Sequence, residues 1–141
     1  MQQPGDGVVV VGPAELVEAA AARLGHLRVA TYTDGAAAFE AYAQALHQGQ
    51  APRLVVTELE VERISGASLV RAMRALERAS GARPTAALFY AGRAADAGLK
   101  TLISELGQTV HLDRPVQAPV ADQAARLQIA IDRLLAQLKG G

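Results

Sequence analysis

Apolar residues are grouped along the chain into short runs that alternate with longer amphipathic segments. Residues 8–11 are four consecutive valines, a run typical of a parallel strand that is covered on both faces. Shorter apolar runs recur, and each is followed by a segment whose apolar residues have the helical spacing of three and four. The pattern predicts strands at 7–12, 26–33, 54–59, 85–90 and 109–112, and helices at 14–24, 36–47, 67–79, 99–106 and 119–138.

Strand and helix therefore alternate five times with short connections, and this alternation predicts the fold class. Parallel neighbouring strands need crossover helices, so we expect an α/β fold with a doubly wound parallel sheet. Five strands favour the flavodoxin-like (βα)5 order 2-1-3-4-5. The 141 residues suit a single domain, and we expect its ordered core to span about 7–138. Asp34 is placed to cap the helix that follows it.

Charge and composition exclude several classes of function. The chain has 14 basic and 14 acidic residues, so neither nucleic acid nor an anionic membrane is an expected partner. It has no cysteine, which excludes disulfides, thiolate metal sites and cysteine nucleophiles. No apolar run approaches the roughly 20 residues of a membrane span. We expect a cytoplasmic protein.

Ligands of an open parallel sheet bind outside the carboxyl ends of its strands, so those ends hold the candidate site. Neither a P-loop nor a G-x-G-x-x-G motif is present there, and the three histidines lack a metal-ligand spacing. We therefore expect no metal site and no cofactor. The residues at the strand ends are Gly12, Pro13, Glu58, Phe89, Tyr90 and Arg114.

Several short motifs resemble the receiver (CheY-like) domain of bacterial two-component signalling. Residues 52–59 (PRLVVTEL) are similar to the "P-D-L-V-L-L-D-L" of its third strand, and Gly66 stands eight residues after Glu58, where receivers carry a glycine. Residues 34–35 (Asp-Gly) match the start of the second receiver helix, and residues 112–115 (LDRP) resemble the segment that ends in Lys-Pro. The resemblance implies the same flavodoxin-like fold.

The resemblance also implies where a phosphorylation site would lie, and most of that site is altered. The phosphorylated aspartate of receivers falls on Glu58, whose carboxylate stands one methylene further out. The acidic pair that binds Mg²⁺ falls on Gly12 and Pro13, which have no carboxylate. Because Mg²⁺ needs several oxygen ligands, no Mg²⁺ is expected here.

The remaining positions of the receiver site are altered as well. Its lysine falls on Arg114, which keeps the charge but changes the geometry. Its threonine or serine falls on Phe89 or Tyr90, depending on one residue of alignment, and its switch aromatic falls on His111. His111 could be a pH sensor or a partner contact, or simply a half-buried edge histidine.

These departures predict a degenerate receiver, or pseudo-receiver, that signals through protein–protein interaction without aspartate phosphorylation and is not an enzyme. Glu58 and Arg114 could pair across the site and imitate a phosphorylated state, or they could be solvated separately. Two alternatives stay open: a response regulator phosphorylated at a non-standard site, and a small α/β nucleotide-binding or enzymatic domain.

Receivers usually contact a partner or a second copy through the face that corresponds here to 99–106, 109–112 and 119–138. The resemblance therefore implies a protein partner or a homodimer that uses this face. Its candidate contact residues are Leu99, Leu102, His111, Ile129 and Arg133.

Overall fold

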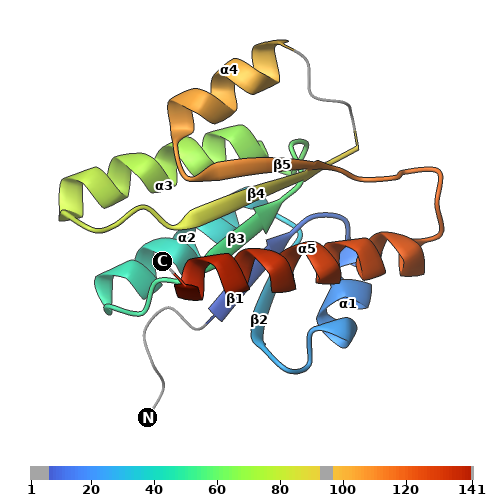
Figure 1. Cartoon of the computed structure of the whole chain (residues 1–141). Coiled ribbons are helices and arrows are strands. Elements are labelled where there is room, and N and C mark those ends of the chain that lie inside the picture. The colour runs from blue at the N-terminus through green and yellow to red at the C-terminus, as the bar shows by residue number, and fades with distance from the viewer. Residues whose placement is uncertain (1–6, 93–96, 141) are drawn as a thin grey trace.

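The computed structural model describes residues 7–92 and 97–140, in which five strands alternate with five helices (Figure 1). Each predicted element is present, with ends that differ by a few residues. In chain order the elements are β1 (Gly7–Val11), α1 (Ala14–Arg23), β2 (Arg28–Tyr32), α2 (Gly35–His47), β3 (Leu54–Thr57), α3 (Gly66–Ser80), β4 (Ala86–Ala91), α4 (Ala97–Leu106), β5 (Thr109–Asp113) and α5 (Val120–Gly140).

The strands form one parallel sheet in the order β2-β1-β3-β4-β5. β1 is hydrogen-bonded to both β2 and β3, with Val9 aligned with Ala30 on one side and with Val55 on the other. The flavodoxin-like order predicted from the alternation of strands and helices is therefore confirmed. β2 and β5 are the edge strands.

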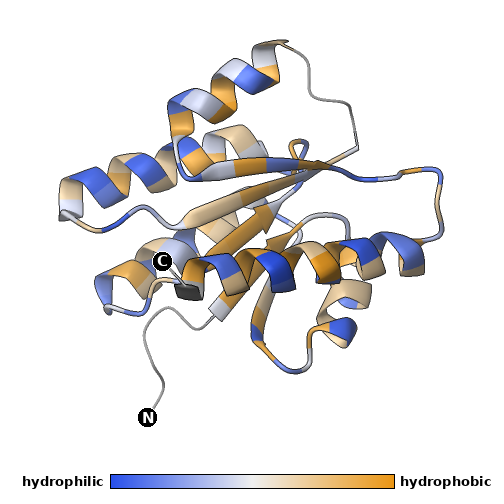
Figure 2. Ribbon diagram, viewed as in Figure 1, coloured by the Kyte–Doolittle hydropathy of each residue, from blue (hydrophilic) through white to orange (hydrophobic). Residues whose placement is uncertain are grey.

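Helices cover both faces of the sheet and create two hydrophobic cores. On one face α1 and α5 pack against β1 and β4, where Val8, Leu88 and Leu127 are buried. On the other face α2 and α3 cover Val55 and Phe89. Hydrophobic residues run along the central strands, whereas hydrophilic and hydrophobic residues alternate on the helices (Figure 2). Burial of this apolar surface is the main favourable contribution to folding.

Short polar side chains begin two of the helices. Asp34 caps α2 as predicted, because its Oδ1 accepts hydrogen bonds from the backbone amides of Ala36 (2.7 Å) and Ala37 (3.1 Å). Ser65 caps α3 by accepting from the amide of Ser68 at 3.1 Å. Gly81 ends α3 in the left-handed conformation that favours glycine, with φ of 70°.

One strand boundary matters for the site. The strand predicted over 54–59 ends at Thr57. Glu58 and Leu59 follow it, and the amide of Glu58 still donates to the carbonyl of Val11 at the end of β1 at 3.1 Å. None of the helices in the described part of the chain is long and apolar enough to cross a membrane.

Candidate functional site

The carboxyl ends of β3, β4 and β5 surround a small hollow at one edge of the sheet. The hollow has a volume of about 310 Å³, enough for a small anion or a few water molecules. It is lined by Pro13, Glu58, Leu59, Glu60, Gly92, Arg114 and Val116.

The carboxylate of Glu58 is held from three directions within this hollow. Its Oε2 accepts hydrogen bonds from Arg114 Nη2 at 2.6 Å, from Arg114 Nε at 2.9 Å and from the backbone amide of Gly92 at 3.1 Å. Its Oε1 accepts from the backbone amide of Leu59 at 2.7 Å. The side chains of Arg114 and Glu58 are 16% and 8% exposed, so the alternative in which they are solvated separately is wrong.

Arg114 is in turn oriented by a residue that the sequence analysis missed. Its Nη1 donates to Gln123 Oε1 at 3.0 Å, and Gln123 Nε2 donates to the carbonyl of Ala118 at 2.9 Å. Gln123 lies in α5 and is only 4% exposed. Gln123 stands one residue before Ala124 and four residues before Leu127, and both of these are buried in the core. A polar residue with the helical spacing of buried apolar residues is therefore the feature of the sequence that could have identified Gln123.

Two glycines let the backbone approach the Glu58 side chain and main chain closely. A Cβ atom on Gly92 would lie 2.7 Å from Val116 Cγ1 and 3.2 Å from Arg114 Nη2. A Cβ atom on Gly66 would overlap the carbonyl oxygen of Glu58. Gly66 was noticed in the sequence through its spacing from Glu58, whereas Gly92 was not.

The structure places Phe89 and Tyr90 away from the hollow, which corrects their assignment to the site. Phe89 is fully buried in the core beneath α2 and α3. Tyr90 points to the opposite core, where its hydroxyl donates to the carbonyl of Gln123 at 2.7 Å. Burial raises the pKa of Tyr90 above its ordinary value. The residue of this segment that reaches Glu58 is Gly92, through its backbone amide.

Gly12 and Pro13 lie beside the hollow, as expected for the end of β1, but contribute no polar side chain. Pro13 stands at the start of α1 without a side-chain cap, and both residues line an adjoining hollow of about 390 Å³ together with Glu60 and Glu62. Across residues 7–92 and 97–140, no three histidine or acidic side chains are grouped closely enough to hold a metal ion.

His111 is half-buried on the edge strand β5. It is aligned with Phe89 of β4, and its side chain is 12% exposed. Its Nε2 lies 3.4 Å from Asp113 Oδ1, and it has no hydrogen-bond partner in the described part of the chain. Within the described part of the chain, no side-chain hydrogen bond joins His111 to Glu58 or Arg114. Its role as a switch residue therefore stays a prediction.

The residues predicted for the interaction face are divided by their exposure. Ile129 is 54% exposed, Arg133 is exposed and Leu102 is half-buried. Leu99 is only 2% exposed, so its assignment as a surface contact is wrong: it belongs to the inward side of α4. Val110 on β5 is 42% exposed and is a further apolar surface residue that the sequence analysis did not select.

Comparison with known proteins identifies the fold. No family model matches the chain, and no curated protein matches it. A mutant of the receiver domain of the histidine kinase CKI1 from Arabidopsis thaliana is similar with a TM-score of 0.75 at 16% identity, over 95% of this chain and 91% of that chain. The phosphorylated cyanobacterial phytochrome response regulator RcpA is similar with a TM-score of 0.68 at 13% identity, over 94% of this chain and 96% of that chain. The BeF3-activated N-terminal receiver domain of RstA from Klebsiella pneumoniae is similar with a TM-score of 0.63 at 22% identity, over 87% of this chain and 96% of that chain. The chain therefore has the fold of response-regulator receiver domains.

Proposed function

We propose that this protein is a pseudo-receiver of a bacterial two-component-type pathway, which binds a protein partner or a second copy of itself without aspartate phosphorylation. The observation that supports this proposal most directly is the state of Glu58. Its carboxylate already accepts hydrogen bonds from Arg114, Gly92 and Leu59, so an internal acid fills the anion-binding part of the hollow.

The chemistry of phosphoryl transfer supports the same proposal. The transfer depends on a positioned nucleophile and on metal ions that neutralise the developing charge. Glu58 Oε2 is engaged by three donors, and Gly12 and Pro13 offer no carboxylate beside it. RcpA was solved phosphorylated and the RstA domain BeF3-activated. We propose that this chain has lost that response.

The face formed by α4, β5 and α5 is the proposed contact surface. β5 is an edge strand with one side open in the described part of the chain, and edge strands readily pair with another chain. Val110 and Ile129 expose apolar side chains there. Arg133, one helical turn after Ile129, adds an exposed positive charge, which suits a partner surface with both apolar and acidic residues.

Incubation with acetyl phosphate and Mg²⁺, followed by intact-mass measurement, tests the proposal. We expect no phosphorylated species for the wild type or for Glu58→Asp, while a receiver domain with a complete acidic pair is phosphorylated in parallel. A phosphoryl adduct on the wild type that is lost in Glu58→Gln would support the response regulator with a non-standard site.

Light scattering of the same samples, with Val110→Asp as the surface variant, reports whether the domain self-associates through β5.

A further inference from the structure

Helix α4 is joined to the rest of the domain by an unusual turn. Gly107 and Gln108 connect α4 to β5, and both have left-handed backbone conformations, with φ of 67° and 47°. This conformation is unfavourable for a residue such as Gln108 that has a Cβ atom. The turn therefore needs contacts from elsewhere in the molecule to keep its shape.

The side chain of Arg74 from α3 supplies those contacts. Its Nε donates to the carbonyl of Leu106 at 2.8 Å, and its Nη2 donates to the carbonyls of Gly107 at 2.9 Å and Gln108 at 3.3 Å. The Leu106 carbonyl ends α4, where helical hydrogen bonding leaves acceptors without partners and a positive charge is favourable. The other two carbonyls lie in the turn, where Gly107 also accepts from the Thr109 hydroxyl and Gln108 from the amide of Ala87. One buried guanidinium, 5% exposed, thus binds three consecutive carbonyls.

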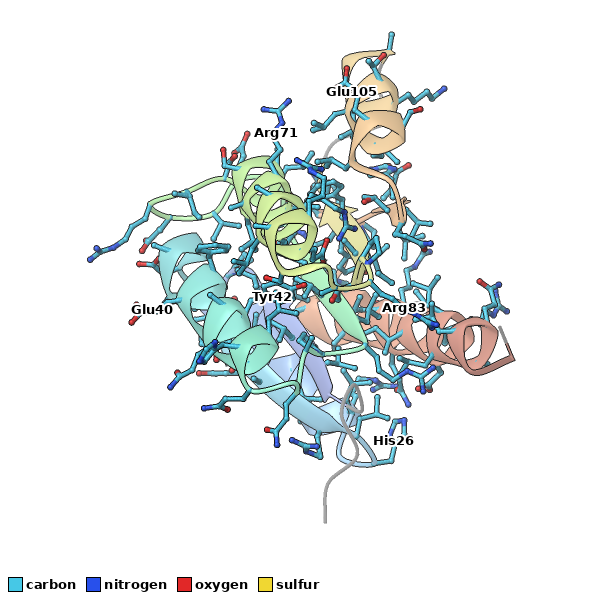
Figure 3. All side chains as sticks on the ribbon, turned by 90° about the vertical axis from the view of Figure 1, so that its left-hand side faces the viewer. His26, Glu40, Tyr42, Arg71, Arg83 and Glu105 are labelled. Carbon is cyan, nitrogen blue, oxygen red and sulfur yellow. The ribbon has the colours of Figure 1, made fainter. Side chains whose placement is uncertain are left out.

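Arg74 is itself held by Glu77, one turn later on α3. Arg74 Nη1 donates to the two carboxylate oxygens of Glu77 at 2.8 and 3.1 Å. Glu77 Oε2 also accepts from the hydroxyl of Tyr42 and, at 2.8 Å, from the backbone amide of Thr85. Tyr42 comes from α2 and lies in the region between α2 and α3 in Figure 3. The cluster thus joins α2, α3 and the start of β4 to the α4–β5 turn.

The cost of this cluster argues that it has a positioning role. Burying an ion pair is expensive, and apolar residues of similar size often stabilise a core as well or better. An apolar pair, however, has no donors for three carbonyls. We infer that Arg74 is a positioning residue, which fixes the α4–β5 turn and thereby the orientation of α4. If α4 and β5 bind a partner, as the proposed function holds, the shape of that surface is set by Arg74 from inside the core.

Hydrogen exchange of the full chain tests this inference with the double variant Arg74→Met/Glu77→Gln. The side-chain amide that Glu77→Gln introduces keeps an acceptor for Tyr42 and Thr85, and no buried charge is left unpaired. We expect amides of α4 and the turn to exchange roughly tenfold faster or more, because three hydrogen bonds are lost there. Exchange in α1 and α5 should stay as in the wild type.

Tyr90→Phe is the matched control, because it removes one buried hydroxyl on the opposite face of the sheet, where it bonds to Gln123. This variant should leave α4 exchange unchanged. If the double variant does not fold, Arg74→Lys replaces it, since an ammonium group cannot reach all three carbonyls. Unchanged α4 exchange in the folded variant would overturn the inference. The readout involves neither phosphorylation nor a partner, so the inference and the proposed function can fail separately.

Discussion

Each end of the sheet has a glutamate–arginine ion pair, and the two pairs differ in sequence separation, burial and surroundings. At the carboxyl end, Glu58 and Arg114 are 56 residues apart in sequence and meet beside an open hollow. At the amino end, Arg74 and Glu77 are one helical turn apart and are buried, with side chains 6% and 2% exposed. The first pair lines this hollow, whereas the second is enclosed between α2, α3 and the α4–β5 turn.

The two carboxylates also differ in the hydrogen-bond donors that remain when the arginine is removed. Glu58 is held by two backbone amides besides Arg114, so removal of the arginine leaves it with donors and with nearby solvent. Glu77 is held by the Tyr42 hydroxyl and one amide besides Arg74, and it is itself only 2% exposed. A glutamate–arginine pair is thus a candidate functional site beside the hollow and a structural element in the buried cluster.

Removal of each arginine should have the largest effect and should separate the two pairs. Arg74→Met leaves Glu77 charged and buried, and we expect a loss of about 3–5 kcal/mol in the free energy of unfolding. Arg114→Met leaves Glu58 near solvent with its amide donors, and we expect a loss of about 1–2 kcal/mol. Urea unfolding followed by circular dichroism measures both values. Equal losses would contradict the contrast between the two environments.

The sequence placed Glu58 and Arg114 at one end of the sheet and left open whether they pair, whereas it gave no indication of the pair at the amino end. Glu58 and Arg114 follow different strands of one parallel sheet, and the carboxyl ends of such strands share an edge. Arg74 and Glu77 have the spacing of an ordinary surface pair on an amphipathic helix. Their burial depends on how α2 and the α4–β5 turn pack on α3, which no local pattern encodes.

The two wrong assignments have similar physical reasons. Phe89 and Tyr90 stand at the end of β4 in sequence, but their side chains alternate into the two cores, and the chain reaches Glu58 only at Gly92. Leu99 was assigned to the surface from the resemblance to receivers, yet it is one of the two buried apolar residues of α4. The hydrophobic periodicity of α4 favours an inward position for Leu99, because Leu99 shares an apolar stripe with Leu102 and Leu106.

A second prediction uses the two buried tyrosines, one behind each pair, and has an intermediate effect. Tyr42→Phe removes a donor to Glu77, and Tyr90→Phe removes the hydrogen bond to the carbonyl of Gln123. Each should cost about 1 kcal/mol at neutral pH. The loss in the free energy of unfolding caused by Tyr42→Phe should be larger in the wild type than in the Arg74→Met/Glu77→Gln variant, whereas the loss caused by Tyr90→Phe should be the same in both. A double-mutant cycle measures this difference.

The same tyrosines predict how stability changes at alkaline pH. Burial and the hydrogen bond to Glu77 raise the pKa of Tyr42 well above its ordinary value, and burial raises that of Tyr90. The folded protein therefore keeps these protons when the unfolded chain releases them, near pH 10. Stability is fully present below that pH and falls as the pH rises further. Thermal unfolding should show a shallower alkaline decline in Tyr42→Phe than in the wild type. An unchanged slope would contradict the raised pKa.

Arg114→Lys should have the smallest effect and tests how much of the carboxyl-end pair depends on geometry rather than charge. Lysine keeps the positive charge, but a single ammonium group cannot reproduce the two bonds to Glu58 Oε2 together with the bond to Gln123 Oε1. Because the backbone amides of Leu59 and Gly92 still hold Glu58, we expect a loss below about 1 kcal/mol in urea unfolding. Arg74→Lys is the matched change at the other end, where the guanidinium bonds to three carbonyls and to Glu77, and its loss should be clearly larger. A loss at Arg114 as large as that at Arg74 would mean that the hollow at the carboxyl end is part of the folding core, and the Glu58–Arg114 pair would then be structural.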